Sequence, residues 1–256
     1  MSVKDLFSIK GKVALCIGGT SGIGREIAIG LSKAGARVLP VSRTQKKVDA
    51  TVEEIRDSGG SAQGYTADVR NKSEISRVVE EAERDTGGID ILLNSQGITM
   101  LKPAEAFTEE DFDQLLATNL KSVFFASTEV GKRMLQRGSG SIINIASLAS
   151  FRGWGQSAVY AITKWGVVSL TETLAREWAA RGVRVNAIAP GFFLTDLNRS
   201  KMSPERKADA IHRTPFGRFG ELGELVGAAV YLASPASSYV TGTTLRVDGG
   251  FLAAGI

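Results

Sequence analysis

The chain of 256 residues contains one cysteine, one histidine and no long apolar run. Cys16 alone cannot form an intrachain disulfide, and its place inside an apolar run predicts a buried small hydrophobe rather than a reactive thiol. Because His212 is the only histidine, the sequence offers no His/Cys metal cluster and no evidence for a Ser-His-Asp triad. We therefore expect no metal site, and we interpret His212 as a surface or loop residue.

Long blocks of apolar or like-charged residues are absent as well. No segment approaches the roughly 18 apolar residues that span a bilayer, and residues 1–15 lack the apolar core and cleavage signature of a secretory signal. We expect a cytoplasmic protein with no membrane partner. The net charge is only +4, and Lys and Arg are spread among Asp and Glu, so nucleic-acid binding is not indicated.

The chain does contain strand-like and helix-like segments in alternation from end to end. Strand-type runs occupy residues 12–17, 36–42, 61–67, 89–93, 141–146, 183–189 and 243–247. Helix-type segments are expected at 25–35, 44–58, 72–86, 109–136, 157–180 and 221–233, and an irregular stretch at 192–220. This order predicts an α/β fold in a single domain over residues 1–256: a doubly wound, Rossmann-type parallel sheet of about seven strands with helices on both faces.

A glycine-rich turn, GGTSGIG at 18–24, joins the first expected strand to a helix. In that setting Gly18 permits a tight turn, Gly22 lets the backbone approach a pyrophosphate, and Gly24 lets the helix lie close to the strand. Free N–H groups at the helix N-terminus favour phosphate. We therefore expect a dinucleotide cofactor here, whereas the absence of Gly-Lys-Ser/Thr excludes a P-loop.

Polar residues stand at the ends of the next strands. Ser42 and Arg43 follow the second strand, and a guanidinium there suits a 2′-phosphate, which favours NADP(H), with NAD(H) as the alternative. A solvated arginine in the next turn is the other interpretation of Arg43. Asp68 either caps the following helix or bonds the adenine, and Asn94 either ties strand ends together or lines the cofactor.

Three residues with acid–base potential follow the fifth strand. Ser147 comes at its end, and Tyr160 and Lys164 are four residues apart, on one face of the expected helix. A nearby ammonium favours an ionised phenol, so we expect Lys164 to lower the pKa of Tyr160 toward neutrality, with Ser147 bonding the same substrate oxygen. Asn119 lies inside the helix-like segment 109–136, where asparagine suggests a kink or a specific partner.

Taken together, these motifs resemble those of the short-chain dehydrogenase/reductase family over roughly residues 10–250. The resemblance rests on GGTSGIG at 18–24, Asp68-Val69, Asn94-x-x-Gly97, Asn119, Ser147, Tyr160-x-x-x-Lys164, Pro190-Gly191 and Asp248-Gly249-Gly250. It implies a catalytic tetrad of Asn119, Ser147, Tyr160 and Lys164. In that tetrad Tyr160 exchanges the proton, Lys164 also binds the nicotinamide ribose, and Asn119 holds a water.

The resemblance also implies further contacts. Cofactor contacts are expected from Gly18, Thr20, Ser21, Gly22, Ile23, Gly24, Ser42, Arg43, Asp68, Val69, Asn94, Gly97, Tyr160, Lys164, Pro190, Gly191, Phe193 and Thr195. Substrate contacts are expected from Ser147, Tyr160, Gln96, Trp154 and Phe192. Ile17 and Gln96 depart from the usual family residues without touching the tetrad.

Within the family, the chain is similar to gluconate 5-dehydrogenases through Phe192-Phe193-Leu194-Thr195-Asp196 and the segment 213–218. This similarity implies a small-molecule substrate, a gluconate-like sugar acid or polyol. The alternative is a 3-oxoacyl-acyl-carrier-protein reductase, with Lys132 and Arg176 as the docking pair; a non-catalytic NADP-binding scaffold is a remoter one. The family also implies a homotetramer built through the helices at 109–136 and 157–180 and the last strand.

Overall fold

A computed structural model describes residues 2–195 and 202–254. Its centre is an eight-stranded sheet in the order β3-β2-β1-β5-β6-β7-β8, with β4 also paired to β2, and every pairing is parallel. The strands are β1 Val13–Ile17, β2 Arg37–Ser42, β3 Ser61–Ala62, β4 Tyr65–Thr66, β5 Ile91–Asn94, β6 Gly140–Ile145, β7 Val183–Pro190 and β8 Thr244–Val247. The predicted α/β architecture with a parallel sheet of about seven strands is confirmed.

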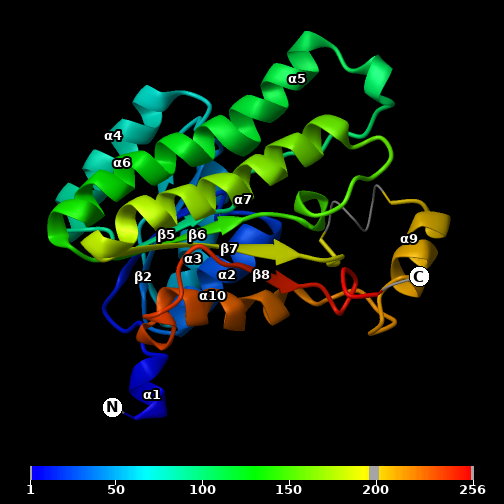
Figure 1. Ribbon diagram of the computed structural model, residues 1–256. Coiled ribbons are helices and arrows are strands. Elements are labelled where there is room, and N and C mark those ends of the chain that lie inside the picture. The colour runs from blue at the N-terminus through cyan, green and yellow to red at the C-terminus, as the bar shows by residue number, and fades with distance from the viewer. Residues whose placement is uncertain (1, 196–201, 255–256) are drawn as a thin grey trace.

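Helices cover both faces of the sheet (Figure 1). The helices are α1 Val3–Leu6, α2 Gly22–Lys33, α3 Gln45–Asp57, α4 Lys72–Thr86, α5 Glu109–Leu116, α6 Ser122–Arg137, α7 Ala158–Trp178, α9 Pro204–His212 and α10 Val226–Ala233. Short 3-10 turns lie at Ala104–Ala106, Leu148–Ser150, Ala179–Arg181, Leu222–Leu225 and Pro235–Ser237. In Figure 1, α4, α6 and α7 pack above the sheet and α2, α3 and α10 below it.

Alternate residues of each strand enter two separate cores. Leu15 of β1 packs with α4, α6 and α7, whereas Cys16 packs on the other face with α2, α3 and α10. Cys16 is fully buried, as the sequence predicts, and burial raises the pKa of its thiol to about 12. His212 is exposed on the last turn of α9.

Two expected elements are interrupted. The strand expected at 61–67 is two short strands, β3 and β4, and Gly64 between them lies so close to α3 that a Cβ there would be 2.1 Å from Val48 Cγ1. The helix expected at 109–136 is broken into α5 and α6 by a π-helical segment, Ala117–Lys121, which contains Asn119. Of the two explanations that Asn119 suggested, a kink or a specific partner, the structure shows specific partners in Ile98 and Thr163, and π-segments of this kind are frequent at functional sites.

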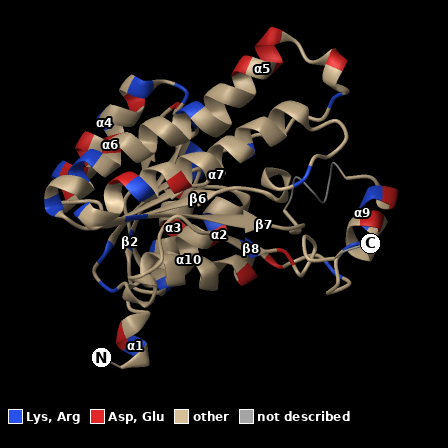
Figure 2. Ribbon diagram, viewed as in Figure 1, with Lys and Arg blue, Asp and Glu red and all other residues tan. Residues whose placement is uncertain are grey.

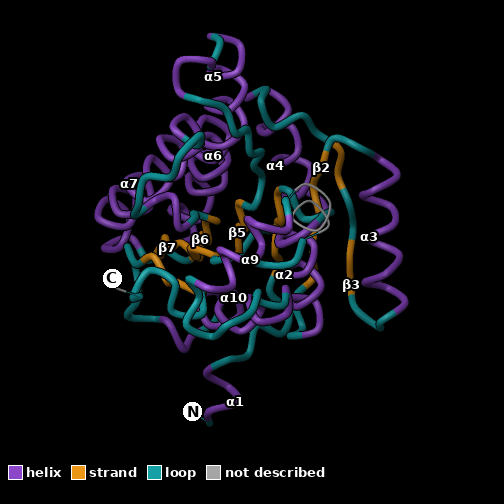
Figure 3. The backbone as a smooth tube through the Cα atoms, turned by 90° about the vertical axis from the view of Figure 1, so that its right-hand side faces the viewer, coloured by secondary structure: helices purple, strands orange, loops and turns teal. Residues whose placement is uncertain are grey.

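The stretch expected to be irregular contains a helix, α9. Its start has a conventional signal, because Ser203 Oγ accepts a hydrogen bond from Arg206 N and Pro204 occupies the first helical turn. Asp196 and the rest of residues 196–201 lie outside the described residues. Viewed from the side of the strands' carboxyl ends, α9 lies in front of the sheet (Figure 3). Within the described ranges, no helix has both the length and the apolar character needed to cross a membrane.

Candidate active site

A cavity of about 750 Å³ opens at the carboxyl ends of the strands, where parallel α/β sheets bind ligands. The sequence-predicted residues on its wall are Gly18, Ser21, Gly22, Ile23, Gly24, Ser42, Arg43, Asp68, Val69, Gln96, Gly97, Ser147, Trp154, Tyr160, Lys164, Pro190, Gly191, Phe192 and Thr195. Residues from most of the chain's length therefore meet in one place. No group of three or more His, Cys, Asp or Glu suited to a metal occurs in residues 2–195 and 202–254.

Four predicted site residues do not line this cavity: Thr20, Asn94, Asn119 and Phe193. Thr20 and Phe193 are buried beside it. Asn94 is buried at the end of β5, where its Nδ2 donates to Asn144 Oδ1 on β6 (2.9 Å) and to Ser127 Oγ on α6 (3.0 Å). Of the two roles considered for Asn94, these contacts match the one that ties neighbouring elements together.

The glycine turn between β1 and α2 is tightly packed. Gly18 has φ +75°, and a Cβ there would lie 2.7 Å from the Gln96 backbone N. A Cβ at Gly24 would lie 2.2 Å from the Gly18 carbonyl oxygen, so only glycine lets α2 approach the turn this closely. The N-cap residue Ser21 makes no side-chain capping bond, and the first turn of α2 has no acidic residue. The N–H groups of this helix end fit the pyrophosphate of a dinucleotide.

The end of β2 brings a cation to the cavity. Arg43 is exposed and makes no hydrogen bond or ion pair within the described part of the chain. Arg70, in contrast, pairs with Asp68, with its Nε 3.0 Å from Asp68 Oδ1. The bonds from Arg70 hold the pKa of the Asp68 carboxyl below its usual value. Of these two arginines, Arg43 is therefore the one available to an anionic ligand.

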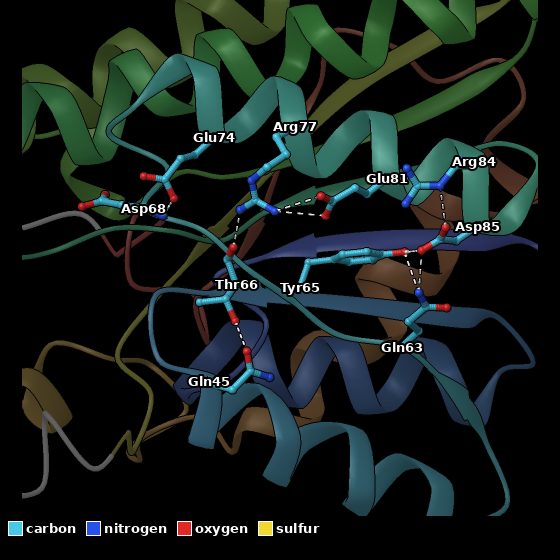
Figure 4. Close-up of polar contacts among 10 residues, drawn as sticks. All are labelled: Gln45, Gln63, Tyr65, Thr66, Asp68, Glu74, Arg77, Glu81, Arg84 and Asp85. Atoms are coloured by element: carbon cyan, nitrogen blue, oxygen red, sulfur yellow. Dashed lines mark hydrogen bonds and ion pairs between the residues drawn. The ribbon is translucent and has the colours of Figure 1, made fainter.

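A polar network fixes the segment that leads to Asp68 (Figure 4). The Thr66 carbonyl oxygen on β4 accepts from Arg77 Nη2 of α4 (2.7 Å), and Thr66 Oγ1 donates to Gln45 Oε1 of α3 (2.5 Å). The Asp68 backbone N–H donates to Glu74 Oε2 on α4 (2.8 Å). These contacts tie the short strand β4 to both neighbouring helices, so Asp68 is held at the cavity edge by backbone as well as by side-chain bonds.

Ser147, Tyr160 and Lys164 meet at the deep end of the cavity. Ser147 follows β6, and the other two lie one turn apart on α7. Burial raises the pKa of the Tyr160 phenol, while its hydrogen bonds with Ser147 and Thr99 act in the opposite direction. Lys164 Nζ lies 5.9 Å from the Tyr160 ring centroid and donates to the Ile145 carbonyl oxygen at 2.7 Å. Burial lowers the pKa of the Lys164 ammonium to about 8.

The expectation that Lys164 lowers the pKa of Tyr160 toward neutrality is wrong for this state of the site. The ammonium bonds to the Ile145 carbonyl, and the burial of the phenol outweighs its two hydrogen bonds. Tyr160 is consequently a protonated phenol here, which is the form that can donate a proton.

Asn119 lies behind this group and is fully buried. Its Nδ2 donates to the Ile98 carbonyl oxygen (2.9 Å) and to Thr163 Oγ1 (3.2 Å), while its Oδ1 accepts from Ile98 N (2.8 Å). A Cβ at Gly97 would lie 3.5 Å from Asn119 Oδ1 and 3.6 Å from Lys164 Nζ. Asn119 thus anchors the loop after β5 to α7, and Gly97 lies between it and Lys164.

Two aromatic residues of the cavity wall, Trp154 and Phe192, pack with Phe251. The rings of Trp154, Phe192 and Phe251 have centroids 5.3–5.6 Å apart. Gln96, on the cavity floor, is 7% exposed; its Nε2 donates to Ser122 Oγ at 3.1 Å, and its buried Oε1 has no partner in the described residues. An unpartnered buried acceptor at a cavity fits a ligand that donates a hydrogen bond.

Several wall residues were missed by the sequence reasoning: Thr99, Leu101, Met202 and Arg206. Residues 98–103 are loop without hydrophobic period, so nothing in the sequence marks the contact of Thr99 with Tyr160. The Ser203-Pro204 helix start did offer a signal for α9, which brings Arg206 to the cavity.

Comparisons with known proteins agree over the whole chain. A family model described as Enoyl-(Acyl carrier protein) reductase matches residues 17–252. Gluconate 5-dehydrogenase of Gluconobacter oxydans is 40% identical over 251 residues, 98% of this chain and 98% of that protein. D-threitol dehydrogenase of Mycolicibacterium smegmatis is 38% identical over 252 residues, 98% of this chain and 96% of that protein. A crystal structure of a gluconate 5-dehydrogenase from Burkholderia cenocepacia, in complex with NADP and tartrate, aligns with a TM-score of 0.96 at 38% identity, covering 99% of this chain and 100% of that chain.

Proposed function

Because the chain belongs to the short-chain dehydrogenase/reductase family, we propose that it is an NADP-preferring enzyme that interconverts a gluconate-like sugar acid, or a related polyol, and the corresponding ketone. The observation that carries this proposal is that Ser147, Tyr160 and Lys164, the last two one helical turn apart on α7, line the same cavity as the glycine turn. The similarity to two gluconate 5-dehydrogenases and a threitol dehydrogenase supports the substrate class.

The residues of the cavity fit a dinucleotide. The uncapped N-terminus of α2 and the close-packed Gly18 and Gly24 would hold the pyrophosphate. Arg43, together with Ser42, would bind a 2′-phosphate, which supports NADP over NAD. The same cavity is also lined by Gly97, Pro190, Gly191, Thr195 and Lys164. When bound, the nicotinamide supplies a hydride to a carbonyl carbon or accepts one from a carbinol carbon.

Tyr160 and Ser147 provide the chemistry at the substrate oxygen. In reduction the Tyr160 phenol donates its proton to the carbonyl oxygen as negative charge develops there. Ser147 Oγ–H hydrogen-bonds the same oxygen and stabilises that charge. In this state of the site the Lys164 ammonium bonds the Ile145 carbonyl oxygen; to stabilise the phenolate that remains it would have to turn toward Tyr160, because an opposite charge nearby lowers the free energy of the ionised form. In oxidation the same groups move the proton in the reverse direction.

Asn119 positions the loop that follows β5. Its two bonds to the Ile98 backbone fix the loop that carries Gly97 and Thr99. The water that the family resemblance assigns to Asn119 would fit beside Gly97, where Asn119 Oδ1 and Lys164 Nζ approach the same point. Such a water would return a proton to Tyr160 through Lys164 after each reduction.

A substrate panel tests this function. We expect NADPH-dependent reduction of 5-keto-D-gluconate with a higher kcat/KM than of an acetoacetyl thioester. The reverse order would replace the proposal with acyl-thioester reduction. Lys132, one of the two docking residues of that alternative, bonds instead to Glu129 Oε1 at 3.1 Å. Absence of turnover with every ketone would favour the non-catalytic scaffold.

We also propose a homotetramer located in the cytoplasm. Support for assembly comes from apolar side chains exposed on the outer layer of helices: Phe124 on α6 (43%) and Ile162 and Trp165 on α7 (53% each). Exposed apolar groups on neighbouring helices are typical of protein interfaces. Light scattering of the purified protein tests the assembly, and a monomer at micromolar concentration would refute it.

A further inference from the structure

We propose that Arg206, on α9, binds the carboxylate of the sugar-acid substrate and makes the enzyme selective for acids over neutral polyols and ketoses. This inference rests on the proposed function, since it names the group that recognises one end of that substrate. Tyr160 and Ser147 act on the reacting carbon, and neither carries a charge that would hold a distant carboxylate.

The position of Arg206 fits this role. It lies in the first turn of α9, which starts at Pro204 in front of the strand ends (Figure 3). Arg206 lines the main cavity and also a side cavity of about 320 Å³. Trp154 and Phe192 are the other residues shared by both cavities, so Arg206 stands where the two meet. A substrate whose alcohol carbon reaches Tyr160 can extend from there toward α9.

The other cations on the cavity wall have different surroundings. Among the described lining residues the cations are Arg43, Arg70, Lys164 and Arg206. Arg70 is paired with Asp68, and Lys164 bonds the Ile145 carbonyl oxygen beside Tyr160. Arg43 lies at the end of β2, on the cofactor side. Among these four cations of the described wall, Arg206 is therefore the one whose side chain is neither bonded within the described residues nor on the cofactor side.

The guanidinium of Arg206 is available. Its side chain makes no hydrogen bond or ion pair within residues 2–195 and 202–254, and its backbone N–H donates to Ser203 Oγ at the start of the helix. Two acids lie on the same helix: Glu205 bonds Ser203 and its own backbone N–H, and Asp209, which shares the side cavity, accepts from Arg213 Nε at 2.8 Å. Charged residues of both signs gather on α9 in Figure 2, and this pairing leaves Arg206 without an acid.

The chemistry at this junction favours a carboxylate. A guanidinium presents parallel N–H donors that match two carboxylate oxygens, and such charge-assisted bonds are stronger than bonds to a hydroxyl. The aromatic residues Trp154, Phe192 and Phe251 line the side cavity beside Arg206 and offer no competing charge. A neutral polyol would place a hydroxymethyl group there and gain a weaker contact.

The test compares two ketones that differ only at this end. L-Sorbose has the carbon skeleton of 5-keto-D-gluconate with a hydroxymethyl group in place of the carboxylate. For Arg206→Gln we expect kcat/KM with 5-keto-D-gluconate to fall roughly 10- to 100-fold, mainly through KM, because a bond between charged groups is lost. The kcat/KM with L-sorbose and the Kd of NADPH should change less than about twofold. Arg206→Lys should recover part of the loss, since it keeps the charge without the paired donors.

Arg152→Gln is the matched control. Arg152 is also an exposed arginine near this end of the molecule, but it lines neither cavity and donates to the Leu252 carbonyl oxygen at 3.5 Å. Equal losses for both ketones in Arg206→Gln, or no loss for the acid, would overturn the role of Arg206 and leave the proposed function standing. Wild-type enzyme that reduces neutral ketones but not 5-keto-D-gluconate would overturn the sugar-acid function and the role of Arg206 with it.

Discussion

The packing of the glycine turn yields a prediction whose size follows from the structure: Gly24→Ala should weaken both the fold and cofactor binding. The added Cβ would lie 2.2 Å from the Gly18 carbonyl oxygen and 2.8 Å from Ser95 Oγ. Carbon and oxygen normally stay about 3.3 Å apart, so α2 must move away from the turn by roughly 1 Å. The Ser95 hydroxyl can rotate aside, but the Gly18 carbonyl oxygen, which is the nearest blocking atom, belongs to the backbone of the turn and cannot.

The energetic cost can be set against a known gain. Overpacking of this kind costs about 1–3 kcal/mol, whereas replacing glycine by alanine in a helix returns up to about 1 kcal/mol. We expect a net loss of about 1–2 kcal/mol, which corresponds to a thermal midpoint lower by roughly 2–8 °C for a chain of this size. A shift of α2 also misplaces its N-terminal N–H groups, and loss of one bond to a phosphate weakens NADPH binding by at least about tenfold.

Thermal unfolding and NADPH fluorescence titration measure the two effects separately. Gly227→Ala is the matched control, because Gly227 lies in α10 with no atom within 4 Å of the added Cβ. Its thermal midpoint should stay the same or rise, with unchanged NADPH affinity. If Gly24→Ala behaves like Gly227→Ala in both measurements, α2 does not depend on the close contact at Gly24, and the assignment of the phosphate site to this turn is unsupported.

Two further predictions concern charged groups in the same cavity. Arg43→Ala should raise the Kd of NADPH roughly 10- to 100-fold and leave that of NADH within about twofold, because only NADPH carries the 2′-phosphate; equal effects on both cofactors would refute this role. Burial lowers the folded-state pKa of Lys164 to about 8 from 10.5. Between these pH values the unfolded chain binds more protons than the folded chain. The contribution of Lys164 to the free energy of unfolding therefore becomes more favourable as pH rises from about 8 to about 10. Lys164→Met should therefore be more stable relative to wild type at pH 7 than at pH 10, by up to about 3 kcal/mol in denaturant unfolding; a pH-independent difference would show that Lys164 is not buried as an ammonium.

The order of the elements and the site residues at the strand ends could be predicted from the sequence, because both depend on short-range sequence patterns. Apolar strands, the turn at Gly18 to Gly24 and the Tyr160–Lys164 spacing are short-range patterns, and a parallel sheet brings every strand's carboxyl end to one edge. This geometry alone places Ser42, Asp68 and Ser147 around one cavity.

The remaining features depend on contacts between distant residues. Asn119 bonds the Ile98 backbone from within a π-helical segment, and Gly64, between β3 and β4, lies against Val48. The orientation of the Lys164 ammonium toward the Ile145 carbonyl, rather than toward Tyr160, is likewise a tertiary effect. The spacing of residues along the chain does not predict these three tertiary contacts.

The substrate side was the least predictable part. The contact of Thr99 with Tyr160 comes from a loop without periodicity. Arg206 reaches the cavity because Ser203 and Pro204 start a helix within a stretch that lacks a sustained hydrophobic period. Hydrophobic periodicity indicates the helices that pack against the sheet. Because α9 lies in front of the strand ends instead, such periodicity does not predict it (Figure 3).

The most direct test of the central claim is the turnover of Tyr160→Phe with NADPH and 5-keto-D-gluconate. The variant keeps the ring and removes only the hydroxyl that bonds Ser147 and Thr99. The proposed mechanism predicts a kcat at least about 100-fold lower, with the Kd of NADPH within a few-fold of wild type, because the proton donor is lost while the cofactor wall is kept. A variant that binds NADPH and still reduces the ketone at the wild-type rate would show that Tyr160 does not supply the proton.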